Sequence, residues 1–281
     1  MRVLIVVLCF AAVTQATSWA NLRPLHRVMH VKRGVPQYDR RIIGGENAVE
    51  GQFKYQVAIQ IEGSGFCGGS LIYENYVLTA GHCVKGANLW TVTGGALNFL
   101  NLNEPGRVTV GTQNATLHEN YNGLVINNDI AVIRLPAGFT GPNIAPVRLP
   151  SASTASDDLV GQTARVSGWG KSSDASITIN PDLKFVDLTV ITNEECETYY
   201  GSLVINANKL CVGTNGGIVS TCNGDSGGPL VITESDGEPT EVGIVSFGSS
   251  LGCESGYPAA FTRVANYIDW IATNTGYPVR P

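Results

Sequence analysis

A nine-residue stretch, 221–229 (TCNGDSGGP), restricts the backbone of this chain more than any other segment. It places Ser226 directly after a carboxylate, Asp225, and among three glycines. Glycine adopts backbone conformations that a Cβ forbids, so several N–H groups can converge on one point beside the serine hydroxyl. Such a point can hold a developing oxyanion. We therefore expect the Ser226 hydroxyl to be exposed, held and reachable.

Serine is a poor nucleophile at its own pKa, so this interpretation requires a histidine base and an acid that orients it. Both residue types are present in distinctive contexts. His82 lies in the stretch LTAGHC (78–83), and Asp129 lies in NNDIAVIRL (127–135). The chain order is therefore His82, Asp129, Ser226, and unrelated serine hydrolases use other orders.

Four motifs make the chain from Ile42 to its end resemble the chymotrypsin-like, trypsin-fold serine endopeptidases. They are RIIGG (41–45), TAGHC, NNDIAVIRL and CNGDSGGPL, and they occur in the order of that family. The resemblance implies that His82 is the general base, Asp129 its orienting acid and Ser226 the nucleophile of an acyl-enzyme mechanism. It also implies an oxyanion hole made by the backbone N–H groups of Gly224 and Ser226.

The same resemblance implies an all-β fold of two packed six-stranded antiparallel β-barrels with a C-terminal α-helix. The residues agree with it. Residues 53–61 alternate as a strand does, residues 264–271 place apolar side chains at helical spacing, and residues 142–158 have the composition of a linker between two halves. The 240 residues from 42 to 281 suffice for one large all-β unit or two small barrels.

The first 41 residues predict export and processing. An arginine precedes a short apolar run, and small residues follow it, which is typical of a secretory signal peptide. We expect it to span residues 1–16, or to end as late as residue 20, although an N-terminal core helix is the alternative. Residues 17–41 are basic and too short to fold alone, so we expect a propeptide. The protease domain then spans residues 42–281, and the product is secreted.

Arg41 and Ile42 form a bond that a trypsin-like protease can cut. By resemblance, the new ammonium of Ile42 would insert beside Asp225, the neighbour of the nucleophile. Removing one partner of a buried ion pair typically costs about 3–5 kcal/mol, enough to favour an inactive precursor. A surface loop is the simpler alternative for this segment. The predicted partners are an activating trypsin-like protease, protein or peptide substrates, and protein inhibitors.

The charge balance argues against other partners. Residues 1–41 hold seven of the 18 Lys and Arg residues and one of the 23 acidic residues, so residues 42–281 carry 11 basic and 22 acidic side chains, a net charge of about −11. Such a surface disfavours nucleic acid and anionic membranes. We expect a monomer with no metal and no cofactor. Asn114 begins a glycosylation sequon, and His118 lacks motif context and is expected at the surface.

Six cysteines remain after Cys9 leaves with the signal peptide, and six cysteines allow fifteen pairings. Zinc binding is the alternative to disulfides. Export favours disulfides, and the resemblance to the protease family selects three of them: Cys67–Cys83, Cys196–Cys211 and Cys222–Cys253.

The resemblance also places a specificity pocket. Its floor is Ser220, six residues before the nucleophile, and its walls involve Ser246, Gly248 and Ala259. Without a carboxylate at the floor, burying Arg or Lys is unfavourable, so we expect cleavage after apolar or aromatic residues. Elastase-like or collagenase-like specificity is an alternative, because the bridge pattern and C-terminal segment look like those of arthropod chymotrypsins and collagenases. A regulatory cascade protease and an inactive binding homologue are two further alternatives.

Overall fold

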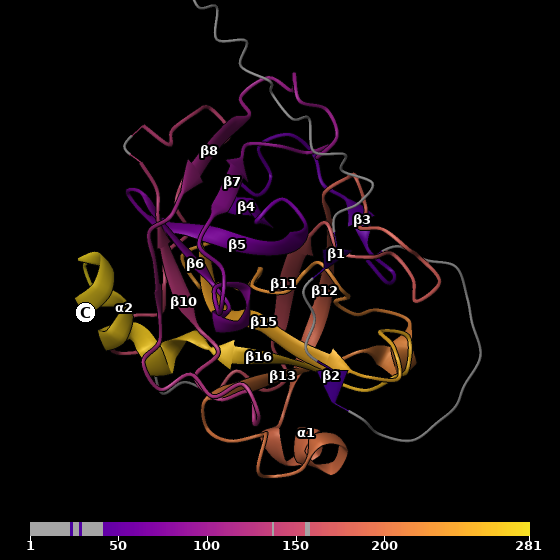
Figure 1. The fold of residues 1–281 in the computed structure, drawn as a ribbon. Coiled ribbons are helices and arrows are strands. Elements are labelled where there is room, and N and C mark those ends of the chain that lie inside the picture. The colour runs from indigo at the N-terminus through magenta and orange to yellow at the C-terminus, as the bar shows by residue number, and fades with distance from the viewer. Residues whose placement is uncertain (1–22, 25–27, 30–41, 137, 155–157) are drawn as a thin grey trace, which may run out of the picture.

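The computed structural model describes residues 23–24, 28–29, 42–136, 138–154 and 158–281, and only the backbone of the first two pairs. The predicted signal peptide, most of the predicted propeptide and Arg41 lie outside the described residues. The two early pairs form β1 (Arg23–Pro24) and β2 (Val28–Met29). β1 pairs in parallel with β5 and β2 with β15, one strand from each half of the molecule (Figure 1).

The first half of the domain is an antiparallel sheet with the order β8-β7-β4-β5-β6-β10-β9. Its end strands, β8 and β9, form no ladder with each other within the described ranges, so the sheet curves but stays open. The strands are β4 (Gln56–Ile61), β5 (Gly65–Tyr73), β6 (Tyr76–Thr79), β7 (Trp90–Gly94), β8 (Val108–Thr112), β9 (Ala115–Leu117) and β10 (Ala131–Arg134).

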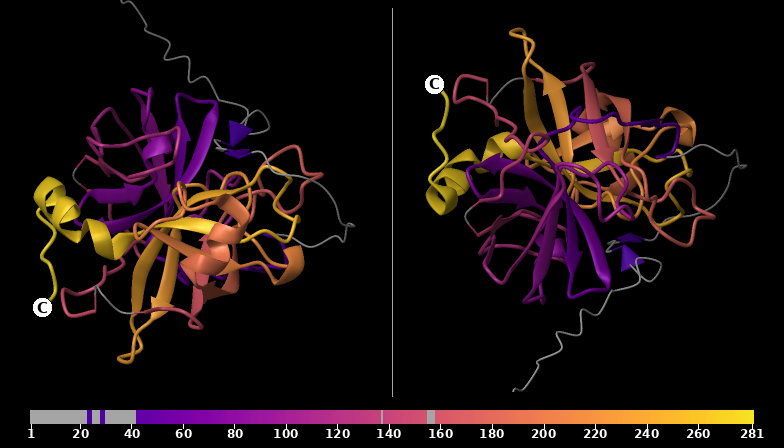
Figure 2. Two further views of the ribbon diagram at one scale, coloured as in Figure 1. Left: turned by 90° about the horizontal axis from the view of Figure 1, so that it is seen from below. Right: turned by 90° about the horizontal axis from the view of Figure 1, so that it is seen from above.

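The second half is a closed six-stranded barrel. β11 pairs with both β12 and β14, which joins the two ends of the order β11-β14-β15-β16-β13-β12, and β3 adds to the outside of β12. The strands are β3 (Glu46–Asn47), β11 (Thr163–Gly168), β12 (Lys184–Ile191), β13 (Lys209–Gly213), β14 (Pro229–Thr233), β15 (Pro239–Ser249) and β16 (Ala259–Arg263). The predicted all-β fold of two halves is confirmed (Figure 2), and the strand pairing closes the second half and leaves the first open.

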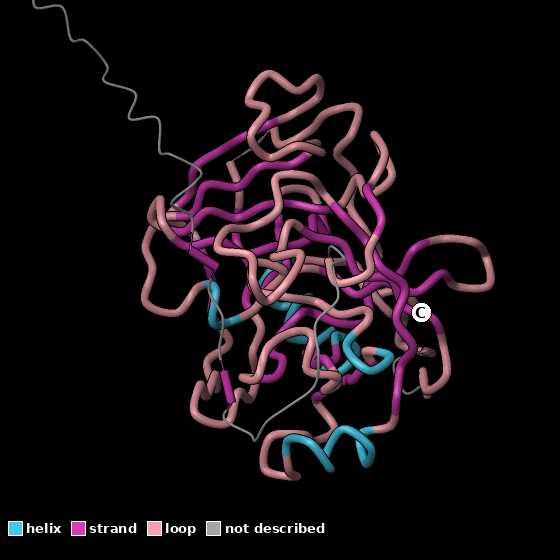
Figure 3. The backbone as a smooth tube through the Cα atoms, turned by 90° about the vertical axis from the view of Figure 1, so that its right-hand side faces the viewer, coloured by secondary structure: helices cyan, strands magenta, loops and turns pink. Residues whose placement is uncertain are grey.

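Helices are few and short in the described residues, which are mostly strands and loops (Figure 3). The predicted C-terminal helix is present as a 3₁₀ turn, η4 (Val264–Tyr267), followed by α2 (Ile268–Thr275). α2 packs its buried Ile268 and Ile271 into the core of the first half, although it follows the last strand of the second. Two further 3₁₀ turns are η2 (Gly81–Cys83) and η3 (Asn215–Gly217).

Helix α1 (Asn193–Tyr200) was not predicted from the sequence, although a signal for it exists. Thr192 caps its N-terminus, and the side chain accepts a 3.0 Å hydrogen bond from the Glu195 amide. Threonine followed three residues later by glutamate is the pattern of a capping box. The helix has only two buried residues, so its apolar spacing is too weak to reveal it.

Side-chain burial alternates along strands that face only the core of their own half. It does not alternate along strands at the contact between the halves. β12 alternates between buried and more exposed residues, as expected for a strand with one face on a core. β4 is buried throughout, and its polar Gln56 accepts a 2.6 Å hydrogen bond from Ser167 of the second half. Polar side chains can be buried here because they are paired across the two halves.

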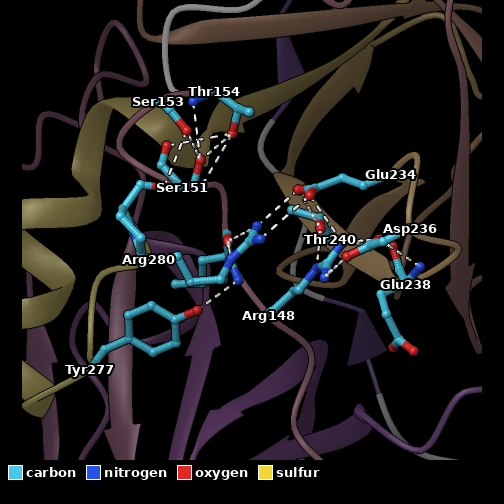
Figure 4. A network of polar contacts seen from close by, with 12 residues as sticks. Arg148, Ser151, Ser153, Thr154, Glu234, Asp236, Glu238, Thr240, Tyr277 and Arg280 are labelled. Atoms are coloured by element: carbon cyan, nitrogen blue, oxygen red, sulfur yellow. Dashed lines mark hydrogen bonds and ion pairs between the residues drawn. The ribbon is translucent and has the colours of Figure 1, made fainter.

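A polar network fastens the linker between the halves to the second barrel (Figure 4). Arg148 of the linker binds Glu234 at 2.9 Å and Asp236 at 2.6 Å, in the β14–β15 hairpin. Arg280, near the C-terminus, binds Glu234 at 2.8 Å and the carbonyl of Leu149. Three segments far apart in the sequence are thereby held together on one face of the molecule.

Three disulfides cross-link the domain: Cys67–Cys83, Cys196–Cys211 and Cys222–Cys253. These are the pairs that the resemblance implied. The first ties β5 to the turn that carries His82, and the third ties the turn before Ser226 to the loop at residue 253. Two of the three bridges therefore brace segments that carry the predicted chemistry.

No helix within the described ranges is long and apolar enough to cross a bilayer.

Candidate active site

His82 lies on η2, directly after the buried strand β6. The turn can approach its neighbour because residue 81 is glycine: a Cβ there would lie 3.1 Å from the amide nitrogen of Ile130. This closeness brings the His82 backbone N–H to within 2.9 Å of Asp129 Oδ1. The imidazole Nδ1 lies 2.9 Å from Asp129 Oδ2. The predicted base and its orienting carboxylate are therefore in contact.

Asp129 is completely buried and well supplied with donors. Besides the two bonds from His82, the Ser246 hydroxyl donates to its Oδ2 at 2.6 Å. Burial raises the pKa of Asp129, but the charge and hydrogen bond of His82, the charge of Lys209 and the Ser246 bond outweigh it and lower the pKa to about 2. Asp129 is therefore a carboxylate at neutral pH.

Ser226 follows the glycine-rich turn and lies at the boundary between the halves. Its carbonyl accepts a 2.8 Å hydrogen bond from Gly68 of β5. Gly227 has a φ of +79°, and a Cβ there would lie 2.2 Å from the Thr79 hydroxyl, so only glycine fits. Ser226 is only 2% exposed, so the expectation of an exposed, reachable hydroxyl is wrong for this form of the chain, because the two halves and the closed cavity cover it. The two halves meet at the backbone of the predicted nucleophile.

No hydrogen bond joins the Ser226 hydroxyl to the His82 imidazole within the described residues, and the link between the two residues runs through the backbone of Ser226. Cys83, next to His82, places its Sγ 3.7 Å from the Ser226 carbonyl oxygen. Within the part of the chain that the structure describes, His82 Nε2 is buried and has no hydrogen-bond partner. The structure therefore joins His82 to Asp129 and brings Ser226 beside them, but the contact between nucleophile and base remains to be made.

The amides predicted to form the oxyanion hole lie in the same turn. Gly224 has a φ of +104°, and a Cβ there would lie 2.8 Å from Ile179. The neighbouring amides are used inside the turn: Asp225 N–H donates to Cys222 and Gly228 N–H to Asp225. In the hydrogen-bond network of the described residues, the amides of Gly224 and Ser226 have no such role. They are available for an anionic oxygen.

A cavity opens beside Ser226, and two of the four predicted pocket residues line it. Ser220 and Gly248 are among its walls, and a Cβ at Gly248 would meet nothing within 4 Å. Ser246 instead binds Asp129, and Ala259 lies in the core of the second barrel. The remaining walls are Thr221, Cys222, Val245, Phe247, Ser249, Gly252, Cys253, Tyr257 and Pro258. The lining carries no charged side chain.

The free space in this cavity is about 20 Å³, which is room for about one water molecule. Ser220 is buried, and its hydroxyl donates to the Thr221 carbonyl at 2.9 Å. A substrate side chain therefore requires the walls to move apart. The pocket is formed in outline and is closed in this structure.

Asp225 is completely buried, and it is held by backbone amides. Its carboxylate accepts hydrogen bonds from Gly170 at 2.8 Å and from Cys222 at 2.9 Å. Burial raises its pKa to about 6, although both hydrogen bonds oppose this. Ile42 is also fully buried, in the core of the second barrel, and makes no bond to Asp225 within the described ranges. The ion pair expected after cleavage is absent here.

Two residues singled out from the sequence, Asn114 and His118, lie outside the candidate active site. Asn114 is exposed, as a glycosylation site requires. His118 was expected at the surface, but its exposed fraction is 9% and its ring stacks on Trp270 of α2 at 5.1 Å. That prediction was wrong, because α2 comes from the far end of the chain and covers this position.

Within the described residues, two groups bring three potential metal ligands together: Cys67, His82 and Cys83, and Asp174, Cys222 and Cys253. In each group the two cysteines are joined in a disulfide. A metal requires the thiolate, so each group offers one ligand only.

The comparisons with known proteins agree with this arrangement. The family profile described as Trypsin matches residues 42–271. Brachyurin of Leptuca pugilator is 44% identical over 236 residues, which are 84% of this chain and 99% of that protein. Chymotrypsin of Phaedon cochleariae is 39% identical over 283 residues, with 98% of each chain covered. A solved structure of HL collagenase superimposes with a TM-score of 0.75 at 37% identity, over 84% of this chain and 99% of that chain.

The family match spans the described domain, and it coincides with a histidine–carboxylate pair placed beside a serine in a glycine turn. The chain therefore belongs to the trypsin family and is a serine endopeptidase, similar to the chymotrypsin-like enzymes of arthropods.

Proposed function

We propose that this protein is a secreted zymogen whose processed form cleaves peptide bonds after apolar or aromatic residues. The observation that carries the proposal is the bonded pair of His82 and Asp129 beside Ser226. In this mechanism His82 Nε2 takes the proton of the Ser226 hydroxyl as that oxygen attacks a peptide carbonyl. Asp129 holds the tautomer with the proton on Nδ1 and stabilises the imidazolium cation.

The acyl-enzyme forms and breaks at the glycine turn. The oxyanion of each tetrahedral intermediate is bound by the amides of Gly224 and Ser226, and losing one such donor costs roughly 3–4 kcal/mol in comparable enzymes. His82 returns its proton to the departing amine, and water then repeats the sequence to release the acid. No metal or cofactor takes part in these steps.

The proposed specificity follows from the lining of the cavity. Ser220 supplies a hydroxyl that is already bonded to a backbone carbonyl, and no carboxylate lies in the walls. Burying an unpaired Arg or Lys there is unfavourable. Gly248 leaves one wall open, which supports a large apolar side chain such as Leu, Phe, Tyr or Met.

The proposed activation joins three observations. The cavity has space for little more than a water molecule, Asp225 has no cationic partner among the described residues, and Ile42 is held within the uncleaved chain. We propose that residues 1–16 direct export and residues 17–41 form the propeptide. A trypsin-like protease then cuts after Arg41, the Ile42 ammonium pairs with Asp225, and the pocket opens.

A peptide panel tests this function directly. Chromogenic peptides that differ only in the residue before the cut are assayed with the purified chain, before and after trypsin treatment, with Ser226→Ala as the matched control. We expect no turnover before treatment, turnover of Leu, Phe, Tyr and Met peptides after it, and none by the control. A clear preference for Arg peptides would contradict the pocket assignment, and activity of Ser226→Ala would contradict the mechanism.

Collagen cleavage is a second candidate, because relatives named collagenase share the fold and 36–37% identity. Incubating the processed enzyme with native collagen and with gelatin separates the two. Loss of the intact triple helix supports this candidate, and digestion of gelatin alone leaves chymotrypsin-like cleavage of unfolded chains.

A further inference from the structure

A buried lysine lies close to the site and has no part in the mechanism above. Lys209, the first residue of β13, has an exposed fraction of 0%. Its ammonium donates to the carbonyl oxygen of Ile126 and lies 5.6 Å from the ring centroid of Phe247. Ile126 and Phe247 belong to one small apolar cluster beside the Cys196–Cys211 disulfide. A buried charge is unfavourable unless it is paired, so this lysine needs an explanation.

The bonded carbonyl belongs to the segment that delivers Asp129. Ile126 and Asn128 both have a φ of +51°. This conformation is a genuine outlier for a β-branched residue such as isoleucine, and it persists only where the surroundings impose it. Ile126 is only three residues before Asp129. A relaxation at residue 126 would therefore move the carboxylate that orients His82.

The strained segment is held at three points. Lys209 binds the Ile126 carbonyl, the Tyr267 hydroxyl donates to Asn128 Oδ1 at 2.9 Å, and the Thr262 hydroxyl donates to the Asp129 carbonyl at 2.8 Å. Lys209 and Thr262 are directly opposite each other on β13 and β16. Opposite residues of an antiparallel pair project to the same face of the sheet. Neighbouring residues of β13 and β16 in the second barrel thus bind the 126–129 segment of the first half.

We propose that Lys209 is a positioning residue for the proposed peptide-bond hydrolysis: its buried ammonium holds the 126–128 segment in its strained conformation and so keeps Asp129 against His82. The inference rests on the proposed function. It adds a residue from the second barrel that acts on the catalytic carboxylate without touching substrate.

The charge of Lys209 depends on few groups. Burial lowers its pKa to about 8, against the opposing effect of Asp129. Of the other ionisable groups on the elements around it, Arg263 donates to the Lys209 carbonyl and remains a cation. Burial raises the pKa of the Tyr200 and Tyr267 hydroxyls, so both stay neutral near pH 8. His82 is bonded to Asp129 and makes no hydrogen bond with Lys209 within the described residues.

Deprotonation of the Lys209 ammonium therefore weakens its hydrogen bond to the Ile126 carbonyl. A charge-assisted hydrogen bond is roughly twice as strong as one between neutral groups, and the neutral amine loses that advantage. Above about pH 8 the processed enzyme should lose kcat as Lys209 becomes neutral. Loss of the Ile42 ammonium also lowers activity at alkaline pH, but it acts on the pocket and so on KM. Measuring kcat and KM separately therefore distinguishes the effect of Lys209 from that of the Ile42 ammonium.

The experiment compares Lys209→Met with Lys54→Met, a change at an exposed lysine, in the trypsin-processed enzyme. We expect Lys209→Met to lower kcat by about 10- to 100-fold, the size of effect that a small misplacement of a catalytic group produces. Its Tm should change little, because the loss of a buried charge is offset by the loss of its hydrogen bond to the Ile126 carbonyl. The fall of kcat near pH 8 should vanish in Lys209→Met and persist in Lys54→Met.

The result that would overturn the proposal is a kcat within twofold of the unmodified enzyme, with the same alkaline fall. A merely structural role would lower Tm and the active fraction, and leave kcat per active site unchanged. Active sites are therefore counted with an organophosphonate that labels Ser226. If the unmodified processed enzyme is neither labelled nor active, the proposed function fails, and this outcome is distinct from a failure of Lys209.

A second measurement on the unmodified enzyme covers the case in which Lys209→Met does not fold. The proton on His82 Nδ1, bonded to Asp129, gives a low-field NMR signal whose position reports that hydrogen bond. We expect the signal to shift between pH 7 and pH 9 with a midpoint near 8. A constant position over this range, together with a constant kcat, contradicts a role for the Lys209 charge.

Discussion

The two halves of the site differ in how completely they are assembled in the uncleaved chain. The half contributed by the first sheet is finished: His82 and Asp129 are bonded twice, and Asp129 has a further donor in Ser246. The half contributed by the second barrel is not, because the pocket has about 20 Å³ of free space and Asp225 has no cation near it within the described residues.

The difference has a physical cause. The bonds of Asp129 are made by groups that exist in the continuous chain, so folding alone forms them. The cation that Asp225 needs is an ammonium that peptide-bond hydrolysis must create. Activation can therefore be controlled at the second barrel, because His82 and Asp129 are already bonded in the uncleaved chain.

The largest expected effect comes from breaking the finished half. Asp129→Asn keeps the shape of the side chain but removes the charge that selects the His82 tautomer. Related serine proteases lose about 10⁴-fold in kcat on this change, and we expect a similar loss here. The measurement is kcat of the processed enzyme, with Asp187→Asn, in an exposed pair with Arg165, as control. A loss below about tenfold would mean that Asp129 does not orient the base.

A smaller effect on activity is expected at Asp225 in the second barrel, without a matching loss of stability in the uncleaved chain. Asp225→Asn removes the partner of the Ile42 ammonium, so the processed enzyme should lose roughly 200- to 5,000-fold in kcat/KM, from about 3–5 kcal/mol for a broken buried pair. The uncleaved form of the same variant should not be destabilised. The carboxylate there has a pKa raised to about 6, so stability falls as the pH rises toward that value, and the amide avoids this loss.

Thermal unfolding of the uncleaved forms at pH 5 and pH 7, with kcat/KM of the processed forms, checks both effects. If Asp225→Asn lowered the stability of the uncleaved chain as much as its activity after processing, the residue would be structural in both states. The contrast between the two halves of the site would then disappear.

The smallest effect is expected on the pH dependence of stability, at a contact between the two halves that does not involve the catalytic residues. Glu241 on β15 is fully buried, and its Oε2 accepts a 2.5 Å hydrogen bond from Ser70 of β5. Burial raises its pKa to about 8. The folded state therefore holds a proton that the unfolded state releases, and stability falls as the pH rises from about 4.5 to 8. Glu241→Gln should remove this fall and stabilise the protein at pH 8 on the order of 1–3 kcal/mol.

Thermal unfolding of Glu241→Gln and of the exposed control Glu238→Gln at pH 5 and pH 8 tests this expectation. Each kcal/mol corresponds to roughly 2–4 °C in Tm for a domain of this size. An equal fall in Tm for the unmodified protein and Glu241→Gln would show that Glu241 does not govern the stability of the contact between halves.

Several elements could be read from the sequence because their signals are local. Alternation over 53–61 predicted β4, helical spacing predicted α2, and motif context predicted the pairing of His82 with Asp129. The predictions that failed or were missing depend on contacts between distant segments. His118 is buried by a helix 150 residues further on, and Ser246 was assigned to the pocket wall, yet its hydroxyl binds Asp129.

The sequence by itself therefore determined the family, the order of the reactive residues and the all-β architecture, because glycine turns, strand periodicity and motif spacing are properties of neighbouring residues. Only the tertiary structure decided which half closes into a barrel, that the pocket is shut, and that Lys209 is buried and bonded to Ile126, three residues before Asp129. Burial and charge pairing depend on what segments far along the chain place nearby, and no local pattern records that.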